Sequence, residues 1–343
     1  MCTWHNSTYE QNTFAPSILH PLSVITVPIH VFAAYVILFK TPSTMGSVKT
    51  SMLALHLCGA YLDILISVLS TQYLLIPAAA GYQTGLNTYL GIPTVVQEYI
   101  FFISMCLTGC TILGFFECRY NAIVRGDSGS LFGNKKRFLY IGGHVLFAVF
   151  FILPVTLNPP DQKLGKEHVK KLLPCLPDYI MNHPDLFVFS IDIALLEILV
   201  AIPITVIPTE CCIFAAKIAI FLSGTRAKSK RTHKLQVQFF IALCIQISIP
   251  MTALIVPVVY NIGAFTKGYF NQALNNITLN MMALHGIISS LVMLIVHRPY
   301  RQVVTSVFCI PCSRVKKLTS SRNSQVGAEA SVFVTGLQTT AVP

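Results

Sequence analysis

The chain has 343 residues, of which 54% are hydrophobic and 11% are charged, and its mean hydropathy is +0.66. These values exclude a soluble globular domain. The formal net charge of +11 is high enough to suggest a nucleic-acid-binding protein, but the basic residues lie at the edges of apolar stretches and do not form one basic face. We therefore expect membrane lipid as a partner, and no nucleic acid.

Seven apolar stretches follow one another along the chain. They cover residues 17–39, 50–76, 94–117, 138–157, 186–216, 237–261 and 273–296. The first holds 23 residues, enough for about 34 Å of helix and so enough to cross a bilayer. Because backbone groups have no water partners in hydrocarbon, each stretch is predicted to be helical. The predicted fold is an all-α membrane protein with a seven-transmembrane helix bundle over residues 17–297.

Basic residues are concentrated in alternate gaps between these stretches. Of the 24 Lys and Arg residues, 19 lie in the first, third and fifth gaps or after the last stretch, counting Lys217 at the end of the fifth. By the positive-inside rule, these segments are cytoplasmic, the N-terminus lies outside and the C-terminus lies inside. An odd number of spans in this orientation is the topology of receptors.

The segment before the first span, residues 1–16, is predicted to be extracellular. It carries the sequon Asn6-Ser7-Thr8, so Asn6 is a candidate glycosylation site. No Lys or Arg precedes Lys40, so we interpret the first span as an uncleaved signal anchor. Cys2 and Cys175 both fall outside, where a disulfide bond between them is compatible with the sequence but weakly specified by it. The cysteines show no metal-ligand spacing, and no cofactor is expected.

Ionisable residues inside the predicted spans are candidate functional residues, because charges are costly there. Glu98 lies near the outer end of the third span, and Asp192 and Glu197 lie in the outer part of the fifth. These three are candidates for a ligand pocket. The alternative for Glu98 and Asp192 is that they are solvated at the membrane interface.

Asp63 and His285 are predicted to form a buried pair between the second and seventh helices. Asp63 lies 14 residues after Lys49, and His285 lies 12 residues before His297. These separations correspond to about 21 Å and about 18 Å of helix, which places both side chains at a similar depth. An imidazole can donate a hydrogen bond to the carboxylate. The competing partners are Asn280, Ser289 and Ser290.

Candidate residues for coupling to a cytoplasmic partner lie at the inner end of the third span. Arg119 and Tyr120 follow Glu117, and the guanidinium can pair locally with that carboxylate or release it and meet the partner. The alternative is that Arg119 only reflects the positive-inside rule. The short third inner loop adds a basic group that includes Arg226, Lys230 and Arg231.

The chain after the seventh span divides into two parts. Residues 298–312 form a juxtamembrane segment, predicted to be a short helix along the inner leaflet and followed by a tail at 313–343 that we expect to be disordered. Cys309 and Cys312 lie in a setting that suits S-palmitoylation. The span ends in the motif His297-Arg298-Pro299-Tyr300-Arg301.

This motif, preceded by His285-Gly286, resembles the end of the nematode serpentine chemoreceptors of class H. Three further blocks resemble the same family over about residues 18–312. They are Leu62-Asp63 with Ile76-Pro77-Ala78-Ala79-Ala80-Gly81-Tyr82 and Gly85; Phe116-Glu117-Cys118-Arg119-Tyr120-Asn121; and Pro174-Cys175-Leu176-Pro177. The resemblance implies a G-protein-coupled chemoreceptor in the plasma membrane, in the cilia of sensory neurons, which binds small environmental molecules and signals to a heterotrimeric G protein.

Two features limit how far a receptor mechanism can be transferred. The acid precedes Arg119 by two positions and the only Trp is Trp4, so the chain departs from the rhodopsin-like pattern.

The motifs of enzyme sites that we considered do not occur, and no enzyme activity is expected. The rival function is a channel or carrier with a polar pathway through Asp63, Glu197 and His285. No internal repeat is visible, which argues against a carrier. A receptor-like protein that never couples is a third alternative.

Overall fold

The computed structural model describes residues 2–42, 45–127, 133–224 and 230–308. Within these residues, seven helical segments are long and apolar enough to cross a membrane. They are Phe14–Lys40, Val48–Leu69, Thr94–Arg125, Lys135–Leu157, Ile193–Gly224, His233–Lys267 and Gln272–Val296. The prediction of a seven-transmembrane bundle is therefore confirmed, and the chain is a multi-pass membrane protein.

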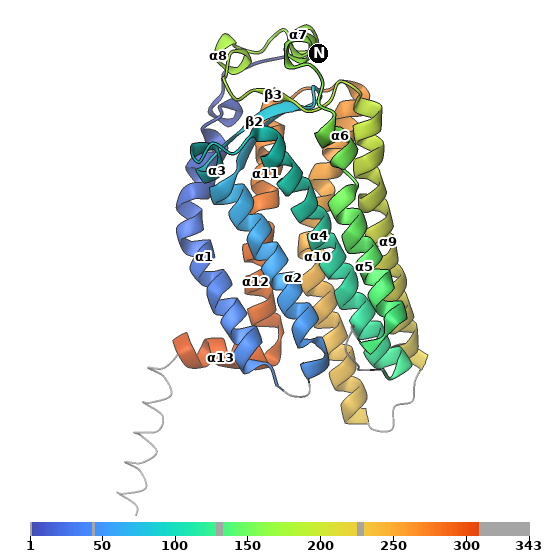
Figure 1. Ribbon diagram of the computed structural model, residues 1–343. Coiled ribbons are helices and arrows are strands. Elements are labelled where there is room, and N and C mark those ends of the chain that lie inside the picture. The colour runs from blue at the N-terminus through green and yellow to red at the C-terminus, as the bar shows by residue number, and fades with distance from the viewer. Residues whose placement is uncertain (1, 43–44, 128–132, 225–229, 309–343) are drawn as a thin grey trace, which may run out of the picture.

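The helices run side by side along one bundle axis (Figure 1). They are α1 (Phe14–Lys40), α2 (Gly46–Ile64), α4 (Thr94–Tyr120), α5 (Lys135–Phe150) with α6 (Leu153–Leu157), α9 (Ile193–Gly224), α10 (Lys230–Lys267), and α11 (Gln272–Ala283) with α12 (His285–Val296). Short π-helical turns, η3 (Leu65–Leu69) and η4 (Asn121–Arg125), extend α2 and α4. The seventh span is interrupted at Leu284, between α11 and α12.

The core of the bundle is centred on α4, which packs against α2, α5 and α9. Its Ile112, Leu113 and Phe115 are fully buried. α12 in turn packs against α1, α2 and α10. Pro250 and Pro257 lie inside α10, where each removes one backbone hydrogen bond without ending the helix.

A small antiparallel sheet covers one end of the bundle, which we call the sheet end (Figure 1). It has the order β1 (Thr71–Leu75), β2 (Ala80–Thr84) and β3 (Phe187–Val188). Tyr73 pairs with Tyr82, and Ala80 pairs with Val188. α3 (Leu86–Tyr89) follows β2.

The sheet corrects two predicted boundaries. The second apolar stretch was expected to be helical to residue 76, but its last residues form β1, and the fifth helix begins at Ile193 and not at residue 186. These apolar residues are buried by other protein segments instead of lipid. Tyr73 and Val188 share a buried cluster with Val169, Ile180 and Phe270. Hydropathy alone does not distinguish these two kinds of burial.

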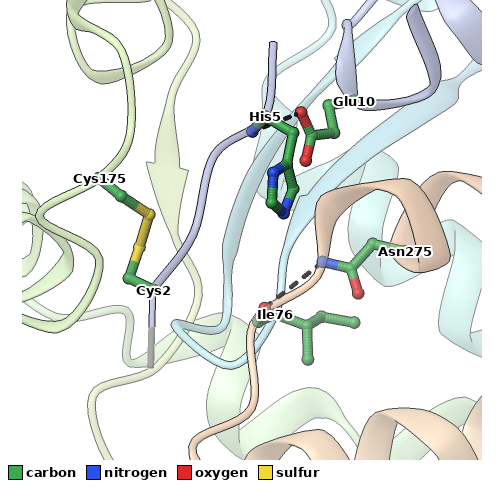
Figure 2. Close-up of a disulfide and its surroundings, with 6 residues drawn as sticks. All are labelled: Cys2, His5, Glu10, Ile76, Cys175 and Asn275. Carbon is green, nitrogen blue, oxygen red and sulfur yellow. Dashed lines mark hydrogen bonds between the residues drawn. A yellow bond between two sulfur atoms is a disulfide. The ribbon is translucent and has the colours of Figure 1, made fainter. Parts of the chain in front are cut away.

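The loop between α6 and β3 forms a cap over the sheet with the N-terminal segment. It contains α7 (Gln162–Leu172) and α8 (Asp178–Met181), and η1 (Thr8–Glu10) lies in the N-terminal segment. Cys2 and Cys175 are joined by a disulfide with their Cα atoms 5.7 Å apart (Figure 2). The bond that the sequence left open is therefore present in the structure.

Hydrogen bonds order the N-terminal segment and attach it to the sheet, which is in turn bonded to α11. Glu10 accepts hydrogen bonds from the backbone N–H groups of His5 and Ser7, both at 3.0 Å (Figure 2 draws the first). The Tyr73 hydroxyl donates to the Glu10 carbonyl at 2.7 Å. Burial raises the pKa of the Tyr73 hydroxyl, so it stays protonated as a donor. Asn275 donates to the Ile76 carbonyl at 3.4 Å and so links α11 to the sheet (Figure 2).

The opposite end of the bundle, which we call the α13 end, carries α13 (Arg298–Phe308), lying across the helix axes (Figure 1). Tyr300 anchors this helix, since its buried hydroxyl lies 2.8 Å from the Thr41 hydroxyl and 3.2 Å from Met52 Sδ. A short helix after the seventh span thus matches the sequence expectation. Cys309, Cys312 and the predicted tail at 313–343 lie outside the described residues.

Candidate functional site

A cavity of about 180 Å³ lies at the sheet end of the bundle. Its walls come mainly from α4, α9 and α10, and the β1–β2 hairpin and β3 contribute residues that include Leu74, Gly81 and Phe187. Most lining side chains are apolar, and six of them are phenylalanines: Phe101, Phe102, Phe151, Phe187, Phe189 and Phe265. An apolar cavity with a few polar groups is the usual form of a small-molecule site.

Two of the three predicted pocket residues line this cavity, Glu98 from α4 and Glu197 from α9. Asp192 does not. Its side chain is exposed, and its Oδ1 accepts a hydrogen bond from the Leu195 N–H at 3.2 Å, before the first turn of α9. The candidate pocket predicted from the sequence is therefore corrected to Glu98 and Glu197, with Asp192 as a residue that caps α9.

Glu98 is buried, with 6% of its surface exposed. The Gln72 side-chain amide donates to its Oε2 at 3.1 Å, and the Gln83 side-chain amide donates to its Oε1. Both glutamines belong to the hairpin, on β1 and β2, so the sheet positions the carboxylate. Solvation of Glu98 at the membrane interface is therefore wrong. Glu197 accepts a hydrogen bond from the Thr266 hydroxyl of α10 at 3.3 Å.

A second cluster surrounds Asp63 in the interior of the bundle. His285 Nδ1 lies 2.9 Å from Asp63 Oδ1, so the structure brings the predicted pair into contact. The interruption of the seventh span at Leu284 leaves N–H groups free at the start of α12, and those of Gly286 and Ile287 donate to the carboxylate at 3.1 and 2.8 Å. A helix N-terminus stabilises a negative charge, so these donors suit an ionised carboxylate.

Sequence reasoning missed two histidines in this cluster. His30 Nε2 lies 3.2 Å from Asp63 Oδ2, and its Nδ1 lies 3.2 Å from the Ser290 hydroxyl. His56 Nε2 lies 2.9 Å from the His30 carbonyl. Ser290, expected as a competing partner of Asp63, binds the histidines instead. The available signal was the presence of His30 and His56 inside apolar stretches.

At the α13 end, the structure separates Glu117 from Arg119. Glu117 pairs with Arg137 of α5, whose Nε lies 2.8 Å from Oε1 and whose Nη2 lies 3.1 Å from Oε2. Asn121 also donates to the carboxylate. The expected local pair of Glu117 and Arg119 is therefore wrong. Residues two apart on a helix point to different sides, so these two side chains do not face each other.

Arg119 instead packs over the Phe239 ring of α10, with its guanidinium carbon 4.2 Å from the ring centroid. Phe239 also contacts the His297 ring, at 5.2 Å between centroids. His297 Nε2 lies 2.9 Å from Gln246 Oε1. Arg119 thus lies in a contact chain that joins α4, α10 and the end of α12.

The remaining coupling candidates surround the same end. The Tyr120 ring packs against Phe214 of α9, with 5.3 Å between ring centroids. Pro299 and Tyr300 lie in the first turn of α13, and Arg301 donates to the Ile295 carbonyl at 3.2 Å. Lys230 and Arg231 are the first residues of α10, and Arg226 lies outside the described residues.

Comparison with known proteins agrees with this architecture. The family described as "Serpentine type 7TM GPCR chemoreceptor Srh" matches residues 10–310. "Serpentine receptor class H-72" of Caenorhabditis elegans is 29% identical over 302 residues, which cover 84% of this chain and 83% of that protein. The matched region contains all seven spans, the cavity with Glu98, the Asp63 cluster, the pair of Glu117 and Arg137, and α13.

Proposed function

Since the chain belongs to the Srh family of serpentine seven-transmembrane chemoreceptors, we propose that it binds a small environmental molecule and signals to a heterotrimeric G protein. The observation that carries this proposal is the arrangement along the bundle axis. An apolar cavity with buried polar groups lies at one end, and Arg119 lies at the other. A receptor needs a ligand site and a coupling site on opposite sides of the membrane.

The sheet end is the extracellular end in this proposal. The disulfide between Cys2 and Cys175 belongs to an oxidising compartment, and the exposed Asn6 of the same region is the proposed glycosylation site. The α13 end then faces the cytoplasm, in agreement with the distribution of basic residues. We place the protein in the plasma membrane, in the cilia of sensory neurons by family resemblance.

The cytoplasmic surface of the proposal consists of Arg119, Tyr120 and the basic residues Arg226, Lys230 and Arg231. Glu117 acts indirectly, because its carboxylate fixes Arg137 and so the position of α5 against α4. Palmitoylation of Cys309 and Cys312 would attach the chain after α13 to the inner leaflet. Incorporation of labelled palmitate that disappears in a Cys309→Ser, Cys312→Ser variant tests this part.

The geometry does not favour a polar pathway for ions or solutes. Glu197 lines the cavity at the sheet end, whereas His285 lines a separate, smaller cavity in the bundle interior. Asp63 and His285 are bonded to each other and are almost fully buried. The three residues of the rival pathway therefore do not share one cavity among those of the described residues.

A reporter screen tests the proposed function. Cells that express the full chain are exposed to odorants, and calcium or cAMP is recorded. The same measurement is made in parallel on cells that express the chain but lack G-protein α subunits. We expect an odorant response that persists when ion gradients are collapsed and is lost without G protein. A response that follows the ion gradients and is independent of G protein would support the channel or carrier instead.

A further inference from the structure

The electrostatic character of the sheet-end cavity points to the charge of its ligand. Two carboxylates, Glu98 and Glu197, line the cavity. Among the described residues that line it, none is Lys, Arg or His. The cavity therefore contains two groups that can pair with a cation and, among the described lining residues, no basic side chain to pair with them.

Glu98 is the residue of the cavity whose charged form a bound cation would stabilise most. Its carboxylate is buried, and its two described hydrogen-bond partners, the Gln72 and Gln83 amides, are neutral. A buried carboxyl group with only neutral partners is neutralised by a proton unless a cation lies beside it. An ionised carboxylate away from water is costly unless an opposite charge compensates it. A positive group on the ligand would supply that charge.

The walls of the cavity distinguish an organic cation from a metal ion. The six phenylalanines give the cavity an aromatic and apolar lining, and such a lining suits a cation attached to a hydrocarbon body. A hard metal ion needs about six oxygen ligands. No group of three or more His, Cys, Asp or Glu residues suited to a metal occurs in the described part of the chain. The lining thus fits an ammonium group attached to an apolar body.

A third acceptor lies on α10. The side-chain oxygen of Asn261, which lines the cavity, is buried and has no hydrogen-bond partner among the described residues. Such an acceptor is satisfied only when a donor reaches it. An ammonium group carries three N–H donors, one more reason for it to be favoured over a hydroxyl, which carries one.

We propose that this cavity binds a small organic amine in its protonated form, with the ammonium group paired to Glu98 and the apolar body packed among the phenylalanines. The inference rests on the proposed function, since it names the ligand class of the same site. A cavity of about 180 Å³ is slightly larger than the ~150 Å³ cavity known to hold benzene. The ligand is therefore of the size of a single substituted ring.

The test measures binding to the purified full chain in lipid nanodiscs, without G protein, near neutral pH. The probes are three amines, each with its alcohol: cyclohexylamine and cyclohexanol, benzylamine and benzyl alcohol, and 2-phenylethylamine and 2-phenylethanol. Benzoate serves as the anionic probe. Affinity is taken from the ligand-dependent shift of the unfolding temperature. We expect at least one amine to bind about tenfold or more tightly than its alcohol, and benzoate not to bind.

Glu98→Gln removes the charge while keeping the size and the acceptor oxygen, so we expect it to abolish the preference for the amine. Glu197→Gln provides a second variant if Glu98→Gln does not fold, because Glu197 has one hydroxyl partner and is less buried. It should weaken the same preference. Asp192→Asn is the matched control, since this carboxylate lies at the same end outside the cavity, and it should leave the preference unchanged.

Several results would overturn the inference. They are failure of all three amines to bind, alcohols that bind as tightly as their amines, and an amine preference that survives Glu98→Gln in the folded protein or, if that variant does not fold, is unchanged by Glu197→Gln. Failure of the proposed function gives a different result. Amine binding in nanodiscs without any response in cells would contradict G-protein signalling and leave the ligand class intact. A cellular response to alcohols alone would support the receptor and contradict the ligand class.

Discussion

At the scale of single residues, Asp63 shows how the bundle accommodates a buried charge. Its carboxylate accepts hydrogen bonds from two backbone N–H groups at the start of α12. It also lies within hydrogen-bond distance of His30 and His285. Removing one partner of a buried pair costs about 3–5 kcal/mol, because the other is left uncompensated. The cluster thus joins α1, α2 and α12 through one side chain.

We predict that Asp63→Asn and His285→Ala each lower stability or signalling, and that the double variant is no worse than the more damaging single one. The reason is that both substitutions remove the same contact. Thermal unfolding of the purified receptor gives the double-mutant cycle, with Asp192→Asn as the control for loss of a carboxylate. Fully additive effects would show that Asp63 and His285 do not interact energetically.

Gly286 supplies a second prediction at this scale. A Cβ at this position would collide with the Asp63 carboxylate, whereas one at Gly143 of α5 would meet nothing within 4 Å. We therefore expect Gly286→Ala to lower surface expression and the unfolding temperature. Gly143→Ala should be neutral or slightly stabilising, since Ala exceeds Gly in helix propensity by about 1 kcal/mol. Equal tolerance of both substitutions would contradict the observed packing of α12 against α2.

At the scale of elements, the α13 end contains two arginines with different partners. Arg137 joins α5 to α4 through the buried Glu117, while Arg119 packs on Phe239 of α10. The ion pair connects two neighbouring helices and is buried. The contact between a cation and a ring is weaker, of the order of 0.5–2 kcal/mol. Arg119 is therefore the residue better able to leave its site and meet a cytoplasmic partner.

This difference predicts opposite phenotypes for the two arginines. Arg119→Ala should abolish or greatly weaken signalling while surface expression stays near the wild-type value. Arg137→Ala should lower surface expression itself, because Glu117 would be buried with only Asn121 as a described partner. Flow cytometry of a tagged receptor and the reporter response, recorded on the same cells, separate the two effects. Normal signalling by Arg119→Ala would remove this residue from the coupling surface.

At the scale of the whole molecule, the two ends of the bundle carry different features. The disulfide, the sheet and the apolar cavity occupy one end, and α13 and the arginines occupy the other. The sheet is part of the proposed ligand site, because its glutamines donate hydrogen bonds to Glu98 and its residues line the cavity. A ligand bound in this cavity would therefore contact both the sheet and the helices α4, α9 and α10.

The orientation of the molecule predicts where glycan is added. Asn6 is exposed. A second sequon, Asn276-Ile277-Thr278, lies in α11, where Asn276 is buried and donates to the Tyr9 carbonyl at 2.8 Å. We expect Asn6→Gln to abolish the shift in electrophoretic mobility caused by glycosidase, and the Asn276 sequon to remain unmodified. An N-terminal tag should stain intact cells. Staining only after permeabilisation would invert the proposed topology and contradict the receptor function with it.

The sequence by itself determined the seven spans and the contact between Asp63 and His285. Length and hydropathy are sufficient for the spans, because a bilayer accepts only long apolar helices. The pair was predictable because helix rise converts sequence distance into depth, and a buried carboxylate requires a partner. These inferences use position along a helix and not its rotation.

The tertiary structure alone decided which faces meet. Glu117 was expected to face Arg119 but faces Arg137, and Asp63 gained His30 in addition to His285. It also decided that residues 71–75 form a strand buried by the cap and that Asp192 lies outside the cavity. Helices that are apolar on all sides carry little periodicity to mark the buried face. The rotation of each helix therefore follows from packing in three dimensions. The same packing decides which residues line the cavity and which lie beside Asp63, Glu117 and Arg119.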